Sequence, residues 1–363
     1  MGDRGGWRFP TFCWERLLTI SMQRLLPACA LWMIVIAFSA AAQEVPYRIL
    51  KTILPGGTGS FDYVYADQVG RNLYVPRLGD FGRITVFNLD TLEHVGDIPN
   101  VSAHGVAVSR KSMHGFGSSN PVAMWDEKTL ALIKTIDVGG TPDGILYDSF
   151  NDRIYVFSHK APNATVISAS DGSIVGVIDL GGAPEQAVTD GQGHIYVDIE
   201  DKDSIAVIDA ATMEVRNHYD FGGLGGTCAG LAMDVKNQIL FSSCRKPHTM
   251  VILSAGDGKI IAALPIGQGT DGAAFNPNTM EAFSSQSDGT LTVIKENSPT
   301  NFVVEQTVQT MRNAKTLALD RGTNRVFLIS AEFGPSPTGQ PTGGYIRRGP
   351  MVPDSFSILE VGR

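Results

Sequence analysis

The sequence lacks several residues and motifs that mark common catalytic centres. It has four cysteines in 363 residues and no Cys-x-x-Cys-His segment, which excludes covalent c-type haem. The nucleophile motif Gly-x-Ser-x-Gly and the phosphate-binding loop are also absent. These absences argue against covalent catalysis by a nucleophile of a recognisable motif.

Positive charge is scarce too. The chain has 29 Lys and Arg against 37 Asp and Glu, a formal net charge of −8. Four of these bases and two of these acids lie in the first 42 residues, so the rest of the chain carries −10. Nucleic acids and anionic membranes are bound by cationic surfaces, so we expect neither as a partner. No apolar stretch after residue 42 is long enough for membrane insertion.

The first 42 residues are typical of a secretory signal peptide. Arg24 supplies the positive start, residues 25–38 form a short apolar run, and residues 39–42 are the small residues that a signal peptidase needs. We expect cleavage before Gln43. A complete signal also starts at Met22, which predicts that this methionine is the true start. The mature protein is then expected to be periplasmic or secreted.

The rest of the chain contains a repeat. A short segment rich in small and apolar residues recurs seven times, at steps of 39 to 44 residues. The seven segments begin at Phe61, His104, Asp143, Glu185, Ala229, Asp271 and Lys315. A period in the low forties, built from short strands and turns, is typical of a β-propeller. We therefore predict an all-β fold in which residues 43–363 form a single seven-bladed propeller domain, and we expect the protein to be a monomer.

Each repeat divides into four strands. In the third repeat we expect strands over 143–148, 153–157, 164–167 and 174–178, separated by turn signals. The seventh repeat lacks an outer strand, and residues 47–54 resemble the outer strands of other repeats. We predict that this N-terminal strand completes the last blade and closes the ring, which removes exposed strand edges.

One insertion interrupts the repeat. Residues 335–353 are rich in Pro and Gly and join the second and third strands of the seventh blade. Loops of this length are uncommon unless they are functional or disordered. Two interpretations stay open: a lid over the channel mouth, or a surface loop.

The repeats resemble those of the bacterial YVTN/YncE-type propellers. Leu73-Tyr74-Val75 and two equivalent segments match the tyrosine-valine strand of that family, and residues 138–144 are similar to its Gly-x-x-Pro-x-Gly link between blades. The resemblance covers the mature chain and implies a propeller fold and export, but no particular reaction. Other propellers are lactonases, lyases or quinoproteins. A quinoprotein is disfavoured because Trp125 is the one tryptophan after residue 42.

The innermost strands of a propeller line its central channel, and their first residues crowd around one mouth. Alignment of the repeats places ionisable residues there in six of seven blades: Asp62, His104, Asp143, Glu185, Asp271 and Lys315. Two carboxylates about 7 Å apart repel by about 2.4 kcal/mol at an effective dielectric of about 20. Lys315 and His104 are expected to offset only part of this repulsion. Raised pKa values, a bound cation or a wide, wet channel are the three solutions.

No cofactor is certain from the sequence. Asp62, Asp143, Glu185 and Asp271 offer oxygen ligands that suit Ca²⁺ or Mg²⁺. A contribution from His104 favours Mn²⁺ or Zn²⁺ instead. A solvated polar channel without a metal is the alternative.

A second set of polar residues ends the returning strands on the same face. Arg77 and Arg245 are candidates to bind a substrate carboxylate by bidentate hydrogen bonds. His159, like His104, is a candidate general base. Glu200, Gln286 and Glu332 complete this second set. Charged loop tips that merely keep the protein soluble are the alternative interpretation.

Cys228 and Cys244 are the two cysteines after residue 42. The first precedes an innermost strand and the second ends the strand that returns beside it, so both lie at one edge of a blade. In an oxidising compartment this arrangement favours a disulfide. A thiol metal pair and two inert core cysteines are the alternatives.

Three functions are compatible with these features. The favoured hypothesis is an exported propeller that binds a small ligand or metal at the channel mouth. The second is a metal-dependent hydrolase of the lactonase or esterase type, which uses the mouth carboxylates for its metal. The third is a scaffold for a protein partner.

Overall fold

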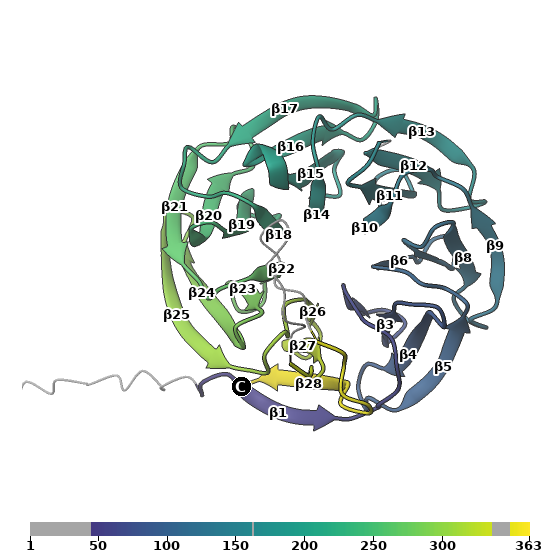
Figure 1. The fold of residues 1–363 in the computed structure, drawn as a ribbon. Coiled ribbons are helices and arrows are strands. Elements are labelled where there is room, and N and C mark those ends of the chain that lie inside the picture. Colours follow the sequence, from purple (N-terminus) through teal and green to yellow (C-terminus); the bar gives the residue numbers. More distant parts are fainter. Residues whose placement is uncertain (1–44, 162, 336–348) are drawn as a thin grey trace, which may run out of the picture. The chain divides into compact units, whose positions relative to one another are not determined.

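Seven four-stranded antiparallel sheets surround a central channel in the computed structural model (Figure 1). The structure describes residues 45–161, 163–335 and 349–363. The predicted all-β, seven-bladed fold is confirmed. The predicted signal peptide, residues 1–42, lies outside the described residues. No helix in the described part of the chain is long and apolar enough to cross a membrane.

The first four blades follow one another along the chain, each running from the channel outwards. Blade 1 consists of β2 (Tyr65–Asp67), β3 (Asn72–Arg77), β4 (Arg83–Asn88) and β5 (His94–Pro99). Blade 2 consists of β6 (Val106–Ser109), β7 (His114–Gly117), β8 (Val122–Asp126) and β9 (Leu132–Ile136). Blade 3 consists of β10 (Pro142–Asp148), β11 (Arg153–Ser158), β12 (Ala164–Ser168) and β13 (Ile174–Ile178). Blade 4 consists of β14 (Pro184–Thr189), β15 (His194–Ile199), β16 (Ser204–Asp209) and β17 (Glu214–Asp220), with the short 3₁₀ turn η1 (Glu200–Lys202) after β15.

The last three blades complete the circle. Blade 5 consists of β18 (Cys228–Asp234), β19 (Ile239–Arg245), β20 (His248–Ser254) and β21 (Ile260–Pro265). Blade 6 consists of β22 (Thr270–Asn276), β23 (Glu281–Gln286), β24 (Thr290–Ser298) and β25 (Asn301–Gln309). Blade 7 consists of β26 (Leu317–Asp320), β27 (Arg325–Ser330), β28 (Ser357–Gly362) and the N-terminal β1 (Arg48–Ile53).

The N-terminal strand closes the ring, as predicted. β1 pairs antiparallel with β28, in a register that runs from Arg48 opposite Gly362 to Ile53 opposite Ile358. Just before β1, the Tyr47 hydroxyl donates a hydrogen bond of 2.6 Å to Glu281 in blade 6. The same residue exchanges two main-chain bonds of 2.8 Å with the Gln306 side chain. The first and last parts of the chain are therefore held together by ladder bonds and by side chains from the neighbouring blade.

The core lies between neighbouring blades. Alternating residues of β3 and β4, such as Tyr74 and Val86, pack against Val106 and Trp125 of the next blade. The second blade lacks the Tyr-Val strand of its neighbours because Trp125 takes the space. A Cβ on Gly115 would lie 2.2 Å from the indole. The glycine in β7 therefore compensates for the large side chain in β8.

Two local predictions can be compared with the structure. Cys228 and Cys244 face each other across β18 and β19 and form a disulfide, as predicted. The insertion of residues 335–353 lies largely outside the described residues. Its base is a short antiparallel ladder, in which Phe333 bridges Met351 and the Gly334 amide donates to the Pro350 carbonyl at 2.8 Å.

Candidate functional site

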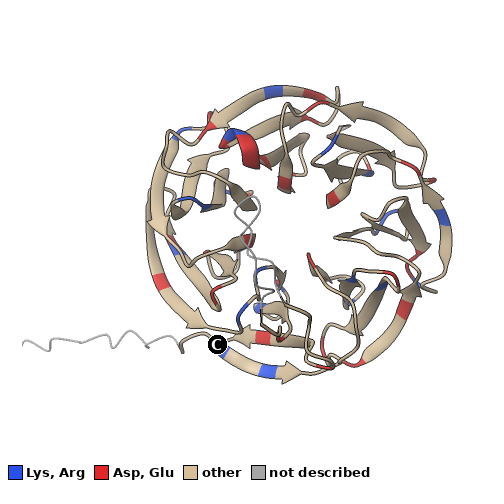
Figure 2. Cartoon of the chain, in the orientation of Figure 1, with Lys and Arg blue, Asp and Glu red and all other residues tan. Residues whose placement is uncertain are grey.

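The predicted channel-mouth residues lie at the start of the inner strands. Asp143, Glu185 and Asp271 are the second residues of β10, β14 and β22. Asp62, His104 and Lys315 lie in the segments that enter β2, β6 and β26. Figure 2 shows acidic segments at the central ends of β10 and β14. The common register of the repeats therefore delivers these side chains to one mouth of the channel.

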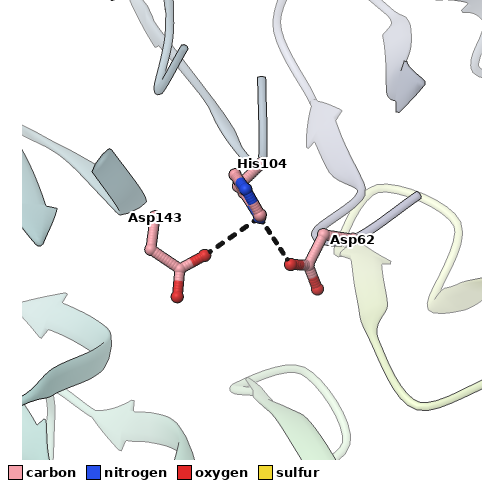
Figure 3. Close-up of side chains that lie close together, drawn as sticks. All are labelled: Asp62, His104 and Asp143. Atoms are coloured by element: carbon pink, nitrogen blue, oxygen red, sulfur yellow. Dashed lines mark hydrogen bonds and ion pairs between the residues drawn. The ribbon is translucent and has the colours of Figure 1, made fainter. Parts of the chain in front are cut away.

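His104 is held between two carboxylates (Figure 3). Its Nδ1 lies 2.8 Å from Asp62 Oδ2 and 3.2 Å from Asp143 Oδ1. The hydrogen bond with Asp62 raises the pKa of His104, against the effect of partial burial. Burial opposes ionisation of Asp62, but His104 and Lys315 together lower its pKa. The two neighbouring carboxylates therefore favour the protonated form of the His104 imidazole.

His159 makes the same kind of bridge one blade further on. Its Nε2 lies 3.5 Å from Asp143 Oδ2 and 3.5 Å from Glu185 Oε1. The interaction with Glu185 raises the pKa of His159 to about 9. Burial opposes ionisation of Glu185, yet His159, Arg245 and the hydroxyl of Tyr63, which donates at 3.0 Å, lower its pKa.

Asp143 is the carboxylate that both histidines share. Burial and the nearby charges of Asp62 and Glu185 raise its pKa to about 6, although the histidines act in the opposite direction. A raised carboxyl pKa was one of the three solutions expected for a crowded mouth, and it occurs at this position.

A lysine and an arginine side chain occupy the other side of the mouth. Lys315 Nζ lies 3.4 Å from Asp62 Oδ1 and also contacts Asp271. Arg245, at the end of β19, contacts Asp271 and donates to Glu200 at 2.6 Å. Blade 5 places Cys228 and its disulfide at the register position, and Arg245 from the second set supplies the charge of this blade.

Acids and bases alternate around the mouth. The charge ring, as we call it, consists of Glu185, His159, Asp143, His104, Asp62, Lys315, Asp271, Arg245 and Glu200. Five carboxylates thus meet four bases. Burial and the neighbouring Glu185 raise the pKa of Glu200, where the two ends of the series meet. The offset of charge is larger than we expected from Lys315 and His104 alone, because His159 and Arg245 also lie between the carboxylates.

Two overlapping groups in the charge ring have the geometry to hold a metal ion. One is Asp62, His104 and Asp143, and the other is Asp143, His159 and Glu185, each with ligand atoms within 4.8 Å of one another. Asp271 belongs to neither group, so the four predicted carboxylates do not converge as one set in the described residues. Mixed oxygen and nitrogen ligands suit Mn²⁺ or Zn²⁺ better than Ca²⁺.

The remaining residues of the second set have different positions. Arg77 is buried, donates to the carbonyls of Gly56 and Gly59, and stacks on Phe356. The structure gives it no contact with the charge ring. Glu332 lines a hollow of about 1020 Å³ beside the ring, together with Arg245, Lys315 and Asp271.

Sequence analysis missed two residues of this region. Tyr63 bonds Glu185 across the channel mouth, and its place directly after Asp62 was the available signal. Arg312 lines the same hollow and has no acidic partner among the described residues. Arg312 lies in a link between two blades, where the repeats offer no equivalent positions to align.

Comparisons with known proteins identify the fold and no family. No family model matches the chain, and no curated protein matches it. Solved structures do match. The structure of U3-55K aligns over 86% of this chain and 98% of its own, with a TM-score of 0.67 and 11% identity. A chain in the crystal structure of the mitotic checkpoint complex aligns over 86% and 95%, with a TM-score of 0.68 and 9% identity. At such low identity the likeness concerns the fold alone.

Proposed function

We propose that this protein is a binding module that takes a small ligand or a metal ion at the mouth of its central channel. The observation that carries this proposal is the charge ring, in which side chains from all seven blades surround one mouth of the channel beside a hollow of about 1020 Å³. Concave sites with a few convergent polar groups and perturbed pKa values are the usual form of ligand sites. A passive channel would not need so many buried carboxylates.

Export to the periplasm or the medium belongs to the same proposal. The signal-like leader, the resemblance to YVTN/YncE-type repeats and the disulfide between Cys228 and Cys244 support it. Disulfides persist in oxidising compartments. A ligand of such a protein would be a periplasmic or extracellular compound.

Metal analysis of the purified mature protein, combined with thermal melting, tests the proposal. We expect Mn²⁺ or Zn²⁺ to raise the melting temperature and EDTA to reverse the effect. The double variant Asp143→Asn, Asp271→Asn should abolish the response. Glu214→Gln, on the outer strand β17 with a 62% exposed side chain, is the matched control. If no metal and no member of a small-molecule library shifts the melt, the binding proposal is wrong.

A metal-dependent lactonase or esterase is the second candidate. The specific observation in its favour is that the two candidate metal groups share Asp143. A cation held by Asp62, His104 and Asp143 would polarise an ester carbonyl and leave His159 to move the proton. Lactone and ester turnover that EDTA abolishes would support this activity. Metal binding without turnover would argue against the hydrolase and support the binding module.

A scaffold for a protein partner is the third candidate. The fold is shared with a chain of the mitotic checkpoint complex, a structure that is an assembly by its name. Affinity capture with the mature protein and with the Asp143→Asn, Asp271→Asn variant would separate the candidates. A partner captured equally by both would point to the outer rim and away from the mouth.

A further inference from the structure

A second cavity lies further along the inner strands from the charge ring. It has a volume of about 190 Å³. Its lining residues come one to three positions after Asp62, His104, Asp143 and Glu185 in their strands, and Leu317 adds one wall from blade 7. The histidine side of the charge ring and this cavity therefore belong to the same four blades.

The walls of the cavity favour an apolar group. Tyr63, Tyr65, Ile145, Leu146 and Leu317 present aromatic and aliphatic side chains. The hydroxyl of Tyr63 is already bonded to Glu185. A ligand would therefore meet these aromatic and aliphatic side chains together with polar groups of the lining.

Gln186 is the amide side chain of the lining, and its bonds are also used. Its Oε1 accepts from the amides of Leu231 and Ala273 at 3.0 Å, and its Nε2 donates to the Ala273 carbonyl at 3.1 Å. These bonds tie blade 4 to blades 5 and 6 and fix the side chain in place. A ligand therefore meets a preformed wall and not a free amide.

Two glycines let the inner strands lie close together beside the cavity. A Cβ on Gly105 would lie 3.2 Å from Ile145 Cγ2, and a Cβ on Gly144 would lie 3.2 Å from the Glu185 carbonyl. The inner strands can approach closely here because neither position carries a side chain. For comparison, an engineered apolar cavity of about 150 Å³ binds benzene. The cavity beside these glycines is large enough for one ring of that size.

The rim of the cavity is acidic. Asp62, Asp143 and Glu185 carry three negative charges when ionised, against two imidazoles on His104 and His159. Lys315, Arg245, Glu200 and the Tyr63 hydroxyl are the other titratable groups in contact with these residues.

We infer that the channel mouth binds a small organic ammonium ion, with its charged head against Asp62, Asp143 and Glu185 and its apolar tail in the cavity. The inference rests on the proposed function and names the ligand class of that site. The head takes the place that an imidazole ring occupies in its absence. The ammonium and the rings of His104 and His159 therefore compete for the same carboxylates.

Calorimetric titration with benzylamine, benzyl alcohol, benzoate and methylamine tests the inference. We expect benzylamine to bind at least about tenfold more tightly than each of the others, a difference of about 1.4 kcal/mol. Asp62→Asn should remove the preference for the amine over the alcohol, while Glu214→Gln should change nothing.

Two further variants test the cavity. Ala187→Leu fills it and should cost benzylamine about tenfold in affinity while methylamine binding is unchanged. Leu317→Ala enlarges it and should favour 2-phenylethylamine over benzylamine, a result that does not depend on the folding of the first variant. Equal binding of amine and alcohol, or a preference for benzoate, would overturn the inference. If a metal binds but no amine does, this inference is wrong and the proposed function stands. If neither metals nor any small molecule binds, the proposed function is wrong as well.

Discussion

Replacement of Asp143 by asparagine should stabilise the folded protein near neutral pH, although it damages the proposed site. The pKa of this carboxyl is raised from 3.8 to about 6. That difference corresponds to about 3 kcal/mol by which ionisation is less favourable in the folded state than in the unfolded chain. The figure already includes the attraction of His104 and His159, which acts in the opposite direction. The Asp143 side chain is only 20% exposed, so solvent screens the effect little.

The sign of this effect fixes its pH dependence. A raised carboxyl pKa means that the folded state binds the proton more tightly, so wild type loses stability as pH rises from about 4 through about 6. Asparagine has no such penalty. We expect Asp143→Asn and wild type to unfold at similar denaturant concentrations at pH 4, and the variant to be more stable by about 2 to 3 kcal/mol at pH 7.5.

Urea unfolding at both pH values measures this difference, and Asp271→Asn provides the contrast. Asp271 is buried and lies between Arg245 and Lys315. Its replacement leaves two cations without that partner and should destabilise the protein by about 3 kcal/mol at pH 7.5. An Asp143→Asn variant that is less stable than wild type at pH 7.5, or a stability difference that is the same at both pH values, would refute the reasoning.

Three further predictions follow from particular contacts. In an NMR titration His159 should titrate near pH 9, and Glu185→Gln should lower this pKa. The stability that the His159 ion pair gives the folded protein should be complete below about pH 6.5 and lost as pH rises to about 9. A wild-type pKa near 6.5 would contradict the ion pair. The double variant Cys228→Ser, Cys244→Ser should lose about 3 kcal/mol in urea unfolding, because the disulfide closes a loop with a separation of 16 residues, and unchanged stability would contradict the bond. Tyr47→Phe should lose about 1 kcal/mol, since it removes the hydrogen bond to Glu281 that ties the closing strand to blade 6, whereas an unchanged melting temperature would show that the bond contributes nothing.

The fold could be predicted from the sequence because every blade repeats the same local pattern. The strands expected over 153–157 and 174–178 correspond to β11 (Arg153–Ser158) and β13 (Ile174–Ile178). The closing strand was predictable too, since residues 47–54 carry the pattern of an outer strand and the seventh repeat lacks one. In each case neighbours along the chain or equivalent positions in other repeats determine the outcome.

The order of the charges in the mouth was not predictable, because it depends on how far side chains reach between blades. Arg77 and Arg245 show the difference. They end β3 and β19, the second strands of their blades. Arg245 turns to Asp271 and Glu200. Arg77 is instead held by the carbonyls of Gly56 and Gly59, in a segment that exists only where the chain enters blade 1 from the closing strand. Ring closure thus gives equivalent positions different partners.

The two sides of the charge ring differ in a way that limits where a cation can bind. Arg245 and Lys315 both contact Asp271, so an incoming cation would have to displace two basic side chains to reach this carboxylate. His104 and His159 can each release a proton and leave their carboxylates to another cation. Exchange of a proton for a metal ion or an ammonium group is therefore confined to blades 1 to 4. The same four blades line the second cavity, together with Leu317 of blade 7, so both candidate metal groups and this cavity lie on one side of the channel.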